Sequence, residues 1–129
     1  MVAAVDVLEK ATNAATSPKR GKRSGDGMSQ DRIEQFKKVL EMDPNDEVVR
    51  FGLGKLYAEA GQHQEAAEQF QAILKLKPDY SAAYLELGKA YRALERPGDA
   101  EATLRQGLEV AQQKGDLHIR NQIQALLGA

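Results

Sequence analysis

Apolar residues recur every three or four positions along most of the chain, which is the spacing of amphipathic helices. The first clear segment covers residues 30–41 and places Ile33, Phe36, Val39 and Leu40 on one stripe. The sequence contains no segment with the strict alternation of apolar and polar residues that a half-buried strand would show. The pattern therefore predicts an all-α fold.

Turn-forming residues divide the rest of the chain into five more predicted helices. Helix-ending and helix-starting residue types stand at Asp43–Asp46, Gly61, Lys77–Asp79, Pro97 and Gly115–Asp116. The predicted helices are residues 47–60, 63–76, 81–94, 97–113 and 117–127. The last one carries Ile119, Ile123, Leu126 and Leu127 at helical spacing, opposite a polar face. This pattern is typical of a helix that covers the end of a stack.

The chain also matches itself after a shift of 34 residues. The aligned positions are Leu53-Gly54-Lys55 with Leu87-Gly88-Lys89, Tyr57 with Tyr91, Phe36 with Phe70 and Leu104, Leu40 with Leu74 and Leu108, and Pro44 with Pro78. Each unit places a glycine and an alanine (Gly54 and Ala66, Gly88 and Ala100) near large side chains. Because two helices approach closely only where a side chain is nearly absent, this arrangement favours one specific hairpin packing.

The repeated positions resemble the tetratricopeptide repeat, a helix-turn-helix unit with the pattern W-x2-L-G-x2-Y, then A-x3-F, then P. Leu53-Gly54, Tyr57, Ala66, Phe70 and Pro78 match it in one unit, and Tyr84, Leu87-Gly88, Tyr91 and Ala100 match it in the next. The resemblance implies an α-α superhelix of stacked hairpins in a domain of residues 30–129. Its parts are a half repeat (30–44), two full repeats (47–80 and 81–114) and a capping helix (116–127).

Three departures from the pattern carry expectations of their own. Arg50 stands where the repeat has a large aromatic residue, so the packing there should be looser. Glu95 replaces the turn glycine seen at Gly61, and Pro97-Gly98 is expected to have shifted that turn. Gln112 replaces the final proline, which predicts that its helix continues further.

The N-terminal extension differs in composition from the repeats. Residues 1–27 hold five Lys/Arg and three Asp/Glu, and residues 16–27 have no large apolar side chain. A segment that buries so little cannot offset its ordering entropy, so we expect residues 1–29 to be a disordered, basic extension. A further hypothesis is that translation begins at Met28 in some contexts.

The composition of the whole chain excludes several functions. With 18 Lys/Arg against 19 Asp/Glu, the net charge of -1 gives no general attraction to nucleic acid or membrane. The absence of cysteine removes disulfides, thiol nucleophiles and thiolate metal sites. No apolar run approaches the ~20 residues of a membrane span, and the first residues lack the basic leader of a signal peptide. We expect a cytoplasmic protein.

The resemblance implies a non-catalytic protein-protein interaction module that binds a peptide or helix of a partner in its concave groove. The first helix of each unit lines that groove. The implied contact residues are Val48, Phe51, Lys55, Ala58 and Glu59 from one unit and Ala82, Leu85, Lys89, Arg92 and Ala93 from the next. Lys55 and Lys89 recur at the same place, so they could receive an acidic side chain or a C-terminal carboxylate; alternatively, they are simply solvated on an open face. Phe51 either contacts the peptide or packs under the neighbouring helix.

The residue types present do not indicate an enzyme. His63 and His118 are the only histidines, and they have no ligand spacing. Neither phosphate-binding glycine motif is present. We therefore expect no catalytic residues, no metal and no cofactor. The alternatives that remain are self-association through the uncapped half repeat and nucleic-acid contact through the basic residues 19–23.

Overall fold

The computed structural model describes residues 23–128 of the chain, with side chains from Gln30 onward. The chain divides into two units, residues 1–31 and 32–129, and the hairpins belong to the second. Every regular element in the described range is an α-helix, so the predicted all-α class is confirmed. The predicted disorder of the basic extension up to residue 22, and its possible contact with nucleic acid, concern residues outside the described range.

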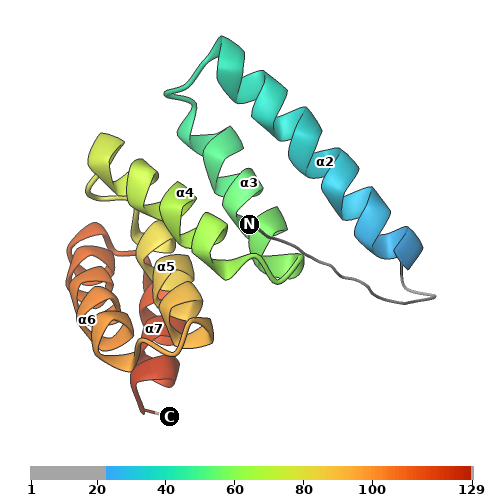
Figure 1. Cartoon of the computed structure of the whole chain (residues 1–129). Helices are drawn as coiled ribbons and strands as arrows, with labels where there is room; N and C mark the ends of the chain where they lie inside the picture. The colour runs from blue at the N-terminus through green and yellow to red at the C-terminus, as the bar shows by residue number, and fades with distance from the viewer. Residues whose placement is uncertain (1–22, 129) are drawn as a thin grey trace, which may run out of the picture. The chain divides into compact units, whose positions relative to one another are not determined.

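Six helices follow one another along the described range (Figure 1). They are α2 (Arg23–Met42), α3 (Glu47–Glu59), α4 (His63–Leu76), α5 (Ser81–Ala93), α6 (Pro97–Lys114) and α7 (Leu117–Gly128). The predicted start of the first helix at Gln30 is wrong, because the backbone is already helical from Arg23. The free energy needed to extend an existing helix by one residue is far smaller than that needed to nucleate a new one. The helix can therefore continue through glycines that would not form a helix on their own. The predicted extension of α6 past Gln112 is confirmed.

The turns that end α3 and α5 have the same geometry. At the end of α3, the N–H groups of Gly61 and Gln62 donate to the carbonyl oxygens of Ala58 and Tyr57. At the end of α5, those of Glu95 and Arg96 donate to Arg92 and Tyr91. Gly61 has φ 80° and Glu95 has φ 61°, so both lie in the left-handed region. The expected shift of the second turn to Pro97-Gly98 is therefore wrong.

The helices pack as successive hairpins. Each helix from α3 to α6 contacts the next in the chain, and α5 also contacts both α3 and α7. One core cluster runs from Ile33 and Leu40 of α2 to Tyr91 of α5 and Ala100 of α6. A second cluster joins Leu85, Leu104 and Ile123, with Ile119, Leu126 and Leu127 packed against it. The last helix thus closes the stack through the apolar stripe that the sequence indicates.

Glycines allow the closest approach within each hairpin. A Cβ at Gly54 would lie 2.7 Å from the Phe70 ring, and a Cβ at Gly88 would lie still closer to Leu104. Phe70 and Leu104 are both fully buried. The predicted contact of a glycine with a large residue in both repeats is therefore confirmed, and it fixes the spacing of α3 from α4 and of α5 from α6.

None of the described helices is both long enough and apolar enough to span a membrane.

Candidate protein-binding groove

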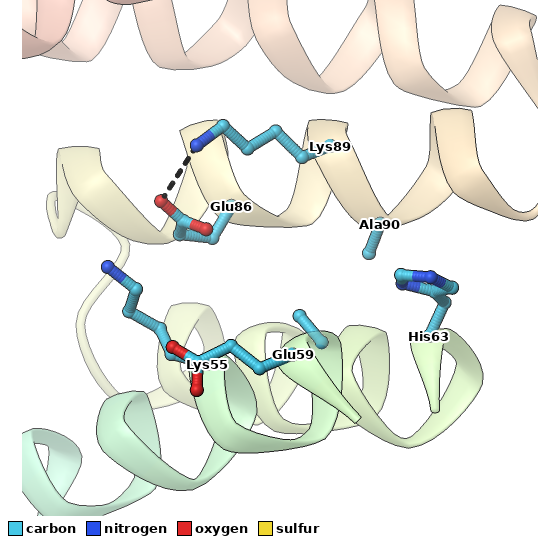
Figure 2. A pocket seen from close by; sticks show the side chains of 7 residues that line it. Lys55, Glu59, His63, Glu86, Lys89 and Ala90 are labelled. Atoms are coloured by element: carbon cyan, nitrogen blue, oxygen red, sulfur yellow. Dashed lines mark hydrogen bonds and ion pairs between the residues drawn. The ribbon is translucent and has the colours of Figure 1, made fainter. Parts of the chain in front are cut away.

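Helices α3 and α5 lie next to each other and form a shallow hollow of about 260 Å³. The side chains that line it are Lys55, Ala58, Glu59, His63, Glu86, Lys89 and Ala90 (Figure 2). Apart from His63, which opens α4, they come from one helix of each full repeat. The structure therefore brings together four residues of the predicted site: Lys55, Ala58, Glu59 and Lys89.

The hollow has small side chains between charged ones. Ala58 is half-buried and Ala90 is buried, and their small side chains leave the space of the hollow open. Lys55, Glu59 and Lys89 are exposed, whereas Glu86 is half-buried. Two acids and two bases leave the hollow without net charge when His63 is neutral.

The cations on this face already have interactions within the domain. Lys89 Nζ lies 3.5 Å from Glu86 Oε2, and Lys55 Nζ lies 5.9 Å from the centre of the Phe51 ring. The guanidinium of Arg92 donates to the carbonyl oxygen of Leu126 on α7. A ligand carboxylate would therefore compete with an existing partner at each of the three cations.

Phe51 packs between neighbouring helices, as one of its two predicted roles requires. Its ring centre lies 5.6 Å from that of Phe70 and 5.4 Å from that of Tyr80, and its side chain is half-buried. Burial, together with the negative charge of Glu47, raises the pKa of the Tyr80 phenol. This aromatic group supports α3 where it meets the start of α5.

The remaining predicted residues lie outside the hollow. Leu85 is only 2% exposed and belongs to the core cluster with Leu104 and Ile123, so its predicted place in the groove is wrong. The reason is that α7 packs onto α5 and covers this side chain. Val48 is 67% exposed at the start of α3, Ala82 is half-buried, and Ala93 is exposed at the end of α5.

Sequence reasoning missed three residues of the hollow: His63, Glu86 and Ala90. Glu86 has no counterpart in the preceding repeat, where Gly52 stands, so the repeat pattern could not indicate it. Its position three residues before Lys89 was the available signal, because that spacing pairs opposite charges on a helix. His63 begins α4, the second helix of its repeat, so an interpretation based on the first helix of each unit does not include it.

The described residues contain no group of three His, Cys, Asp or Glu side chains that could hold a metal ion. The charged groups of the hollow are otherwise suited to ion pairs and hydrogen bonds with another protein.

Stacked helical hairpins with a repeated glycine contact define a helical-repeat domain. The family model of the tetratricopeptide repeat matches residues 33–73 and 57–127. The chain belongs to the tetratricopeptide repeat family.

Solved structures share this fold. A protein from Bordetella parapertussis is 32% identical, with a TM-score of 0.66 over 74% of this chain and 83% of that one. The first tetratricopeptide domain of Spaghetti, bound to the HSP90 peptide SRMEEVD, is 22% identical, with a TM-score of 0.63 over 82% and 86%. MamA is 23% identical, with a TM-score of 0.63 over 68% of this chain, which spans only 48% of MamA. No curated protein sequence matches the chain.

Proposed function

We propose that this domain is a non-catalytic adaptor that binds a peptide or helix of a partner protein in the groove between α3 and α5. The observation that carries the proposal is the hollow between the first helices of two consecutive repeats, with Lys55 and Lys89 at equivalent positions. Tetratricopeptide and related solenoids generally present such surfaces to other proteins. The peptide bound to the Spaghetti domain adds support from a protein of the same fold.

The hollow accounts for only part of the contact that such binding needs. Its volume of about 260 Å³ accepts one or two side chains, whereas stable protein interfaces bury roughly 800 Å² per partner. The bound segment should therefore extend along α3 and α5 beyond the hollow. The exposed side chains of Val48 and Ala93, at opposite helix ends, are available for that contact.

A pull-down from native extract with the full chain and two matched variants tests the groove. Ala58→Arg places a bulky cation on the half-buried floor, and Ala102→Arg makes the same change at an exposed position of α6. We expect a specific partner to be retained by the wild type and Ala102→Arg and lost by Ala58→Arg, with all three equally helical by circular dichroism. Equal retention by the two variants would rule out the groove as the binding surface.

A second candidate function is self-association through α2, and the exposure of Val39 supports it. Val39 is 44% exposed, whereas Ile73 at the equivalent position of the next repeat is fully buried. Met42 on the same helix is 88% exposed. Light scattering of the purified chain tests this: a dimer that Val39→Glu converts to a monomer supports it, and a monomeric wild type at high concentration excludes it.

A further inference from the structure

The Glu86 carboxylate lies in the groove beside the two lysines that could receive an acidic ligand. It comes from α5 and lies 3.5 Å from Lys89 Nζ. In Figure 2 it lies between the side chains of Lys89 and Lys55. The Glu86 side chain is 13% exposed, against 49% for Lys89, so the carboxylate lies within the groove wall while the lysine extends into solvent.

A partly buried carboxylate affects a ligand more than an exposed one. Water screens a surface ion pair strongly, but the screening weakens as the groups are removed from solvent. A ligand carboxylate entering the hollow would meet the Glu86 charge there, and it would have to displace Glu86 from Lys89. Both effects oppose an acidic ligand.

The repeat itself shows that this carboxylate is specific to one position. At the equivalent place of the preceding repeat the residue is Gly52, which packs against Phe36 and carries no charge. The two lysines, in contrast, occupy equivalent positions in the two repeats. Among the described residues Lys55 makes no ion pair, whereas Lys89 is paired with Glu86, so Glu86 distinguishes the second lysine of the site from the first.

We propose that Glu86 sets the charge selectivity of the groove: it excludes acidic segments and favours partners that bring a basic side chain between α3 and α5. The inference rests on the proposed function, since it concerns the same groove. It makes Glu86 a specificity-determining residue and assigns the partner segment a cation that contacts Glu86 or Glu59.

Two peptide probes and one substitution test the proposal. The probes are SRMEEVD, which binds a domain of the same fold, and SRMKKVD, in which lysines replace both glutamates. Affinities of the full chain are measured by fluorescence anisotropy at low salt for the wild type and Glu86→Gln. We expect the wild type to prefer SRMKKVD and Glu86→Gln to bind SRMEEVD about tenfold tighter than the wild type does. The gain should shrink as salt is raised.

Two further variants isolate the cause. Glu101→Gln removes an equal charge from α6, where Glu101 pairs with Arg105 at 2.8 Å outside the hollow, and it should leave both affinities unchanged. The gain from Glu86→Gln should be smaller when Lys89 is also changed to Ala, because the freed lysine contributes part of it. A wild type that prefers SRMEEVD, a Glu86→Gln variant without tighter SRMEEVD binding, or an equal gain from Glu101→Gln would each overturn the proposal. None of these outcomes affects the pull-down comparison of Ala58→Arg with Ala102→Arg, so failure of this inference is distinguishable from failure of the proposed function.

Discussion

Glu95 adopts the left-handed backbone conformation that Gly61 adopts one repeat earlier. Their φ angles are 61° and 80°, and both turns make the same pair of backbone hydrogen bonds. A residue with a Cβ is strained in this region, whereas glycine is not. The hairpin geometry is therefore maintained at Glu95 against the local preference of its residue type.

Replacing Glu95 by Gly should stabilise the domain. We expect the free energy of unfolding to rise by ~1 kcal/mol, because the strain relieved exceeds the entropy that glycine loses on folding. Urea denaturation of the wild type and Glu95→Gly measures the difference. As a matched control, Glu109→Gly on the exposed face of α6 should lower stability by about 1 kcal/mol. A loss of stability at both positions would contradict the prediction.

Adding one methyl group at Gly54 or Gly88 should destabilise the hairpins. The new Cβ would overlap the buried Phe70 or Leu104 side chain, and overpacking of this kind costs ~1–3 kcal/mol. Thermal and urea unfolding of Gly54→Ala and Gly88→Ala test this. Gly98→Ala, whose Cβ would meet no atom within 4 Å, should be neutral or stabilising. If Gly54→Ala proves as stable as Gly98→Ala, the close contact does not determine the packing.

Arg50 and Tyr84 make the same loop contact with different side chains. Arg50 Nη2 donates to the Pro44 carbonyl oxygen at 2.6 Å, and Tyr84 Oη donates to that of Pro78 at 2.7 Å. Arg50 Nε is buried and has no acceptor within the described part of the chain. We expect Arg50→Tyr to raise the free energy of unfolding by ~1 kcal/mol, because it keeps the loop hydrogen bond and removes the unsatisfied donor. Arg50→Phe, which lacks the hydroxyl, should be less stable than Arg50→Tyr in the same denaturation experiment; the reverse order would contradict this account.

Stability should fall at alkaline pH through Tyr84. Burial, together with the negative charge of Asp79, raises the pKa of its phenol above that of the unfolded chain, which is about 10. The native state then binds the phenolic proton more tightly, so this contribution is complete below the unfolded pKa and is lost as the pH rises through the folded pKa. Unfolding free energies measured from about pH 8 to pH 11 should decrease less steeply for Tyr84→Phe than for the wild type. Parallel curves for the two proteins would show that Tyr84 does not contribute to the pH dependence.

The fold was predictable because the residues that pack the two helices of a hairpin together recur at the same positions in each repeat. Gly54 and Gly88 recur with their large partners at a fixed spacing, so each hairpin supports the interpretation of the other. The start of α2 was not predictable in this way, because a helix that is already formed extends through residues with poor intrinsic propensity.

The groove was only partly predictable from the same repeat. The resemblance to the family placed Lys55 and Lys89 on the inner face, and their equivalent positions indicated that they lie on adjacent helices. Leu85 is the counterpart of Phe51, and the repeat could not show that α7 covers it. Glu86 interrupts the repeat, so a method based on equivalent positions does not detect it. Both errors arise where the chain departs from internal symmetry.

The placement of α7 gives the domain a modular C-terminal end. It contacts α5 and α6 in the way that α5 contacts α3 and α4, so it occupies the position that the first helix of another unit would take. Copies of residues 81–114 inserted after Lys114 should lengthen the array while α7 still covers its last apolar surface, and stability should then increase with the number of units.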